Sequence, residues 1–248
     1  KTENHISKGQ QFEVFDSSLI ENKNSVTVGS LQDIKKTYFN INIDPKAYSP
    51  LLILGNEKQK LKLLFNSFVR DHLINNKNIN VLCLDFHPLN MDNVSSSLLK
   101  KDKIYKYSNN EKNFFEHLIE INKKSLNSKK INLLLILGLD ESLSFKENIT
   151  DDIGSQTDNK TKENLLKIIR ERLSLNIIPI VFLRKLSNFS SVFDSLIYEN
   201  SISSDVFSRR IYMDTPQEFN YDYGNLSKHK VFYHDLEKST QQILTIFE

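Results

Sequence analysis

Four short apolar runs, rich in valine, isoleucine and leucine, recur through the middle of the chain. Each run is bounded by polar residues and is continuous rather than alternating, which is typical of strands buried on both faces of a sheet. The runs are LLIL (51–54), INVLCLDF (79–86), INLLLIL (131–137) and IIPIVFL (177–183). They predict the inner strands of a mostly parallel sheet.

Between these runs, apolar residues return at the spacing of one helical face. The clearest case is the set Leu61, Leu64, Phe65, Phe68 and Val69. The same spacing appears in NFFEHLIEI (113–121) and ENLLKIIRERL (163–173). Alternating strands and helices predict an α/β fold with helices on both sides of the sheet.

The two ends of the chain lack the helical pattern. VTV (26–28), a turn at Gly29 and TYFNINI (37–43) predict a half-buried hairpin at the sheet edge, because apolar and polar residues alternate in the second segment. RRIYMD (209–214) and KVFYHD (230–235) predict further edge strands that close the same domain. We therefore expect antiparallel edge strands beside a parallel core.

The 248 residues carry 33 basic and 31 acidic side chains, which suits one large domain. We expect residues 1–25 to be an N-terminal extension and residues 26–235 to be the core. The acidic, polar stretch 144–162 predicts a long loop. A first residue of Lys rather than Met indicates an excised or processed piece, and no apolar run approaches the roughly 18 residues of a membrane-spanning helix.

The number and spacing of the glycines exclude several nucleotide-binding and catalytic motifs. The chain has six glycines, and no two lie within six residues of each other. This spacing excludes an intact P-loop, a Rossmann fingerprint, a kinase glycine loop and a nucleophile elbow. His229 and His234 do not share a face of their predicted strand, so no metal site is predicted. Cys83, inside an apolar run, is assigned to the core.

In an open parallel sheet, ligands bind at the carboxyl ends of the strands. The residues that follow the apolar runs are Gly55, Asp85, Asp140 and Arg184. Gly55 stands where a P-loop would begin, but Lys60 replaces its second glycine, Leu61 its phosphate-binding lysine and Lys62 its hydroxyl residue. All three requirements for cradling phosphates and magnesium fail.

Lys58, Lys60 and Lys62 still bring positive charge to a helix start, where the helix dipole disfavours cations by about 0.3 to 1 kcal/mol each. They are either a residual anion site or solvated lysines, and solvation is the favoured interpretation. Asp140 and Glu141 follow the run 131–137 as a Walker B acid would, or cap the next element. For Asp85 the cap or turn is favoured.

Two further segments carry alternatives. Phe189, Val192, Phe193, Leu196 and Ile197 repeat at helical spacing, which indicates either a packed helix or a hydrophobic groove for a partner; packing is favoured. A second set combines basic and aromatic residues, as a surface for single-stranded nucleic acid does, but two arginines are weak support for such a surface. This second set is Arg209, Arg210, Tyr221 and Tyr223.

The order of these segments resembles the FtsK/SpoIIIE-type RecA-like ATPase domains, which have a P-loop NTPase fold. The resemblance rests on a hairpin ending in INI, LLILG at the P-loop position, VLCLDF, the Walker B-like LLLILGLDE and IIPIVFL. The incomplete P-loop and the segment from VTVGSLQDIKKTYFNINI to LLILG resemble the corresponding parts of one particular domain. This is the last, degenerate ATPase domain of type VII secretion coupling proteins, the EssC/EccC family.

The resemblance implies a cytoplasmic domain of a membrane-anchored protein from a Gram-positive bacterium, which recognises exported substrates and contacts neighbouring ATPase domains. On this basis Gly55, Lys58, Lys60, Lys62, Asp140 and Glu141 form a vestigial nucleotide site. We expect no catalytic residue, no metal and no cofactor, with ATP and magnesium bound only if that site persists. Because the net charge is only +2, no nucleic acid is expected.

Two alternatives remain open from the sequence. One is an active ATPase motor domain whose 55–62 segment still binds nucleotide. The other is a DNA translocase module.

Overall fold

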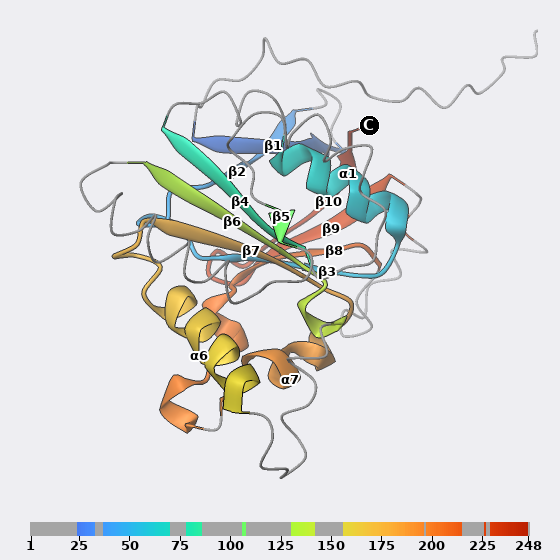
Figure 1. Cartoon of the computed structure of the whole chain (residues 1–248). Helices are drawn as coiled ribbons and strands as arrows, with labels where there is room; N and C mark the ends of the chain where they lie inside the picture. The colour runs from blue at the N-terminus through green and yellow to red at the C-terminus, as the bar shows by residue number, and fades with distance from the viewer. Residues whose placement is uncertain are drawn as a thin grey trace, which may run out of the picture.

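One mixed β-sheet organises the described part of the chain. The structure is a computed structural model, and it describes residues 24–32, 37–69, 78–85, 106–107, 130–141, 156–195, 197–214, 226 and 229–247. Ten strands lie in the order β2-β1-β10-β9-β8-β3-β7-β6-β4-β5 (Figure 1). The strands are β1 (Ser25–Leu31), β2 (Tyr38–Asn42), β3 (Leu51–Leu54), β4 (Ile79–Asp85), β5 (Lys106–Tyr107), β6 (Ile131–Leu137), β7 (Ile177–Leu183), β8 (Arg209–Tyr212), β9 (Lys230–Asp235) and β10 (Thr240–Ile246).

The four continuous apolar runs form β3, β4, β6 and β7, as predicted. β3 pairs with β7, β7 with β6, and β6 with β4, always in parallel. β3, β6 and β7 are buried along their whole length. The antiparallel strands β2, β1, β10 and β9 lie at one end of the sheet, so the predicted α/β fold with a parallel core is confirmed.

Helices cover both faces of the parallel core (Figure 1). α1 (Lys58–Phe68) packs on one face, where its leucines and phenylalanines join a cluster that includes Ile53, Phe182 and Cys83. α6 (Gln156–Arg170) and α7 (Phe189–Phe193) pack on the other face. Cys83 lies in the core, as expected. Among the described residues, no helix has the length and apolar character needed to cross a membrane. The predicted helix at 113–121 lies outside the described residues.

Gly29 does not form the predicted turn. It lies inside β1, at a bulge opposite β2, and the chain reverses only after Leu31, whose N–H donates to Thr37 O at 2.8 Å. A Cβ atom at Gly29 would lie 2.3 Å from Thr245 O. The glycine therefore permits the close approach of the β10 backbone. The hairpin itself is confirmed, with β2 at the edge of the sheet.

Two other predictions were wrong. The segment from Arg209 is not an edge strand, because β8 pairs in parallel with β3 and antiparallel with β9. Likewise, β9 lies between β8 and β10. Residues 156–162, taken as the end of a long loop, form the first turns of α6, where polar side chains mask the helical pattern. The sheet also includes β10, a strand that the polar sequence TQQ at its start did not reveal.

Candidate functional site

The carboxyl ends of β3, β6, β7 and β8 meet at one edge of the sheet, where this architecture places its ligand. Backbone hydrogen bonds lock the ends together: Gly55 N donates to Leu183 O at 3.1 Å, and Gly138 N donates to Phe182 O at 3.2 Å. Met213 N, directly after β8, donates to Leu54 O at 2.8 Å. Gly55, Asp140, Arg184 and Met213 are thus held at this edge.

The connection from β3 to α1 is too short for a phosphate-binding loop. β3 ends at Leu54 and α1 begins at Lys58, which leaves three residues, Gly55 to Glu57. A P-loop places the six residues of its G-x-x-x-x-G motif before its lysine so that successive amides surround the phosphates. Here Glu57 already accepts the first helical hydrogen bond, from Leu61 N at 2.9 Å. The backbone has no loop left to wrap around an anion.

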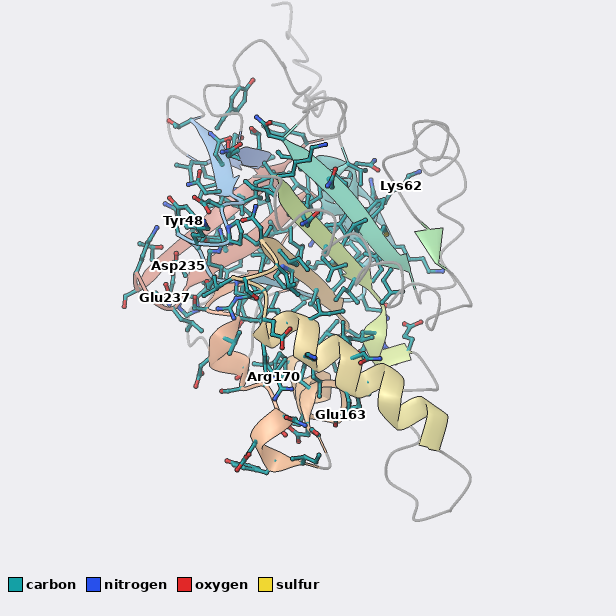
Figure 2. The ribbon with its side chains drawn as sticks, turned by 60° about the vertical axis from the view of Figure 1, so that its left-hand side comes forward. Tyr48, Lys62, Glu163, Arg170, Asp235 and Glu237 are labelled. Atoms are coloured by element: carbon teal, nitrogen blue, oxygen red, sulfur yellow. The ribbon has the colours of Figure 1, made fainter. Side chains whose placement is uncertain are left out.

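Lys60 fills the interior of this site. Its side chain is 1% exposed, and its ammonium donates to Met213 O at 2.6 Å and to Leu226 O at 3.4 Å. Glu57 Oε2 forms an ion pair with it at 3.1 Å. Neither interpretation of the lysines fits Lys60, since its charge is neutralised inside the protein. Lys58 and Lys62 are exposed, as solvated lysines should be. Figure 2 shows Lys62 at the surface.

The phase of α1 explains why Lys60 is buried. Lys60 lies one turn before Leu64 and two turns before Phe68, both fully buried, so it belongs to the inward face of the helix. This phase was readable from the sequence. What the sequence did not reveal is the pair of backbone carbonyls, at residues 213 and 226, that makes burial of a charged amine favourable.

Met213 occupies the space beside Gly55. Gly55 has φ +138°, a conformation that glycine adopts far more readily than other residues. A Cβ atom built on it would lie 2.5 Å from Met213 Cβ and 2.9 Å from Met213 Cγ. The Met213 side chain is fully buried. The sequence analysis did not single out Met213, and its position as the apolar residue after β8 was the available signal.

The Walker B-like acids are already bonded within the protein. Asp140 and Glu141 lie on a 3₁₀ turn, Leu139–Glu141, directly after β6. Asp140 Oδ2 accepts from Asn188 Nδ2 at 2.6 Å and from Arg184 N at 3.1 Å, and Arg184 Nε lies 3.3 Å from Glu141 Oε1. Asp140 Oδ1 is buried without a hydrogen-bond partner. Arg184 and Asn188 therefore donate hydrogen bonds to Asp140, the carboxylate that a Walker B site would offer to a magnesium ion. The side chain of Asp85 lies outside the described part.

The residues present therefore do not fit a magnesium nucleotide. The Met213 side chain takes the space beside Gly55, and the short Gly55–Glu57 connection does not supply a loop of amides for phosphates. The buried ammonium of Lys60 is turned toward backbone carbonyls instead of a phosphate.

The predicted partner-binding residues divide into two groups. Phe189, Val192 and Phe193 are buried in the α6 and α7 cluster, with the Phe189 and Phe193 rings stacked at 4.3 Å. Ile197 is 58% exposed and Tyr198 is 90% exposed. Leu196 lies outside the described residues.

The exposed segment around Ile197 is held firmly against α6. Asn200 Nδ2 donates to Glu163 Oε2 at 3.0 Å, and Arg170 Nη1 donates to Asn200 Oδ1 at 2.5 Å. Ser195 Oγ also donates to Glu163 Oε1. Glu163 and Arg170 both project from the same side of α6 (Figure 2). Ile197 and Tyr198 are thus presented to solvent on a fixed turn.

The arginines of β8 do not form a basic surface. Arg209 and Arg210 are both buried, and Arg210 donates to Phe207 O and Ser204 O, each at 3.2 Å. Burial of their guanidinium groups against backbone carbonyls overturns the suggested surface for single-stranded nucleic acid. Tyr221 and Tyr223 lie outside the described residues.

Comparison with known proteins identifies the fold. No protein-family model and no curated protein matches the chain. Among solved structures, Thermomonospora curvata EccC (ATPases 2 and 3), in complex with a signal sequence peptide, matches with 11% identity and a TM-score of 0.57 over 95% of this chain. EssC (ATPases 2 and 3) from Geobacillus thermodenitrificans matches with 12% identity and a TM-score of 0.60 over 96%. The chain has the fold of these ATPase domains.

The EccC protein of Thermomonospora curvata is described as a type VII secretion ATPase. The match covers 43% of the EccC chain and 46% of the EssC chain, so this chain spans less than half the length of either structure. The pCW3 conjugation coupling protein TcpA, solved with ATPγS, also shares the fold, with 13% identity and a TM-score of 0.61 over 95% of this chain and 69% of TcpA.

Proposed function

We propose that the chain is a non-hydrolysing, ATPase-like domain of a type VII secretion coupling protein and takes part in recognising exported substrates. The observation that carries the proposal is the short Gly55–Glu57 connection, beside which the Lys60 ammonium is bonded to Met213 O and the Met213 side chain packs against Gly55. The likeness to EccC, which was solved with a signal sequence peptide, supports a role in binding exported substrates.

The proposal includes the setting of the domain. Residues 1–248 form a single degenerate ATPase-like domain, cytoplasmic and part of a longer membrane-anchored protein of a Gram-positive bacterium. Its partners are exported proteins and the neighbouring ATPase domains of the same chain. The fixed, exposed pair Ile197 and Tyr198 is the described apolar surface that best suits a protein contact.

We expect the purified chain to release no phosphate from magnesium ATP above the buffer background. Since the site lacks an amide cradle, and since Asp140 Oδ2 and Glu141 Oε1 are bonded to Arg184 and Asn188, the described residues position no terminal phosphate. A phosphate-release assay at millimolar ATP measures this. Lys60→Met serves as the control, because turnover by a contaminant would not change with this substitution. Turnover that depends on Lys60 would contradict the proposal.

The transport role is tested in the bacterium that encodes the protein. Removing residues 24–247 from the full-length protein should stop export by its secretion system. Lys58→Ala with Lys62→Ala should leave export intact, because these exposed lysines hold no phosphate in this account. Normal export after the deletion would remove the transport role, and lost export after the double substitution would revive a phosphate site.

A further inference from the structure

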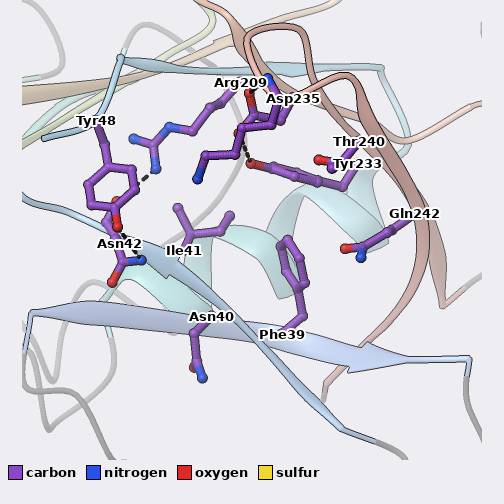
Figure 3. Close-up of a pocket in the computed structure, with 11 residues that line it drawn as sticks. Phe39, Asn40, Ile41, Asn42, Tyr48, Arg209, Tyr233, Asp235, Thr240 and Gln242 are labelled. Carbon is purple, nitrogen blue, oxygen red and sulfur yellow. Dashed lines mark hydrogen bonds between the residues drawn. The ribbon is translucent and has the colours of Figure 1, made fainter.

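A pocket of about 190 Å³ opens at the end of the sheet opposite Gly55 and Met213. β3 and β8 begin side by side at Leu51 and Arg209, so the pocket lies at the amino ends of these strands, whereas Gly55 and Met213 follow their carboxyl ends. Its walls come from β2, the segment containing Tyr48, and the strands β8, β9 and β10 (Figure 3). None of its residues belongs to the site described above.

Arg209 brings a buried positive charge to this pocket. Its side chain is 4% exposed, and its guanidinium donates to Ser49 O at 2.9 Å and to Asn42 O at 2.8 Å. Within the described residues, no carboxylate oxygen lies within 4.0 Å of it. Burial lowers the pKa of Arg209, although the charges of Tyr233, Asp235, Tyr48 and Glu237 act in the opposite direction. A buried cation whose hydrogen bonds within the described structure go to backbone carbonyls is stabilised further when an anion binds beside it.

Lys238 adds a second cation at the mouth of the pocket. Its ammonium lies 5.3 Å from the centroid of the Tyr48 ring, and Arg209 Cζ lies at the same distance from that ring. Lys238 lines the pocket together with Tyr48 and Tyr233. It is exposed and forms no ion pair within the described residues, so an incoming anion can reach it.

The carboxylate that lines the pocket is engaged elsewhere. Asp235 Oδ1 accepts from Lys238 N at 3.1 Å, and Asp235 Oδ2 accepts from Tyr233 Oη at 3.5 Å. Asp235 is 3% exposed. With Arg209 and Lys238 against one internally bonded carboxylate, the lining carries a net charge of +1. Glu237, whose charge also acts on Arg209, does not line the pocket and accepts a hydrogen bond from Ser208 Oγ at 2.7 Å. The lining itself therefore favours anions over cations.

The floor of the pocket is apolar and aromatic. Phe39 and Tyr233 pack with their ring centroids 4.7 Å apart, and Ile41 lies beside them. A dry cavity of about 150 Å³ accommodates benzene in another protein, so the space here admits one ring with a small polar group attached. Because the pocket combines apolar side chains with two cations, it suits a ligand that has both an apolar group and a negative charge.

We propose that this pocket binds a small organic anion: a carboxylate attached to an apolar group about the size of an aromatic ring. The carboxylate lies between Lys238 and Arg209, and the apolar group packs on Phe39, Ile41 and Tyr233. The inference is independent of the proposed secretion function and goes beyond it.

Titration of the intact chain with benzoate, followed by ¹H–¹⁵N NMR, tests the proposal. Saturable shifts are expected at the amides of residues 39–42, 48 and 238–242. Benzamide, which has the ring without the charge, and acetate, which has the charge without the ring, should each bind at least about tenfold more weakly, corresponding to about 1.4 kcal/mol. Equal affinity for benzoate and benzamide, or the absence of saturable shifts at these amides, would overturn the proposal.

Lys238→Met supplies the matched variant, because Lys238 is exposed and the change keeps the backbone N–H that bonds to Asp235. We expect benzoate affinity to fall about tenfold, the size of one charge-assisted hydrogen bond. Lys185→Met, an exposed lysine after β7 at the other end of the sheet, should leave the affinity unchanged. Equal losses in the two variants would show that general charge attraction, and not this pocket, holds the anion.

Discussion

Replacing Lys60 by alanine should destabilise the domain by about 3 to 5 kcal/mol, the usual cost of removing one partner from a buried, charge-bearing network. The substitution leaves Met213 O and Leu226 O without their donor and Glu57 without its ion pair, and it opens a cavity along the lost aliphatic stem. Equilibrium unfolding in urea measures the loss. The effect is large because α1, the end of β8 and residue 226 all meet at one amine.

Two control variants separate charge from packing. Lys60→Met keeps the stem and removes the charge, so we expect a smaller loss of about 1 to 3 kcal/mol, the cost of unsatisfied buried acceptors. Lys62→Ala, on the exposed face of α1, should change stability by less than about 0.5 kcal/mol. If Lys60→Ala lowered the free energy of unfolding no more than Lys62→Ala, the buried contacts of the Lys60 ammonium would not stabilise the domain.

Gly55→Ala is the second substitution with a large expected effect. Its cost combines strain of about 1 to 3 kcal/mol at a backbone angle of φ +138° with overpacking of similar size against Met213. Met213→Ala alone should cost about 2 to 5 kcal/mol through the cavity that it leaves.

The double variant tests whether the two residues meet. Gly55→Ala with Met213→Ala should be less destabilised than the sum of the single changes by more than about 1 kcal/mol, because the shortened side chain makes room for the new methyl group. Additive losses would show that Met213 does not fill the space beside Gly55. Thermal or urea unfolding of the four proteins provides the comparison.

The inner strands could be predicted from the sequence because burial on both faces leaves an unbroken apolar run, as at 51–54 and 131–137. β8 could not be placed in the same way. Its two arginines, Arg209 and Arg210, interrupt the apolar signal, yet both are buried because carbonyl groups from other segments accept their hydrogen bonds. Such partners are distant in sequence and cannot be read from local spacing.

The candidate site shows the same division. The departure from the P-loop residues at 60–62 was visible in the sequence, and the structure adds that helix α1 already begins at Lys58. What replaces the cradle was not visible, because Met213 lies about 150 residues from Lys60 and reaches it only through the pairing of β8 with β3. For the same reason the exposed position of Ile197 and the burial of Phe193 became clear only from the fold.

The proposed loss of nucleotide binding is tested most directly by thermal unfolding of the intact chain with and without magnesium ATP. A ligand present at 100 times its dissociation constant stabilises a protein by about 2.7 kcal/mol, which raises the unfolding midpoint of a domain this size by about 5 °C or more. We predict no change in the midpoint at millimolar magnesium ATP. A rise of several degrees that disappears in Lys60→Met would contradict the account, because it would show that Lys60 still serves a nucleotide.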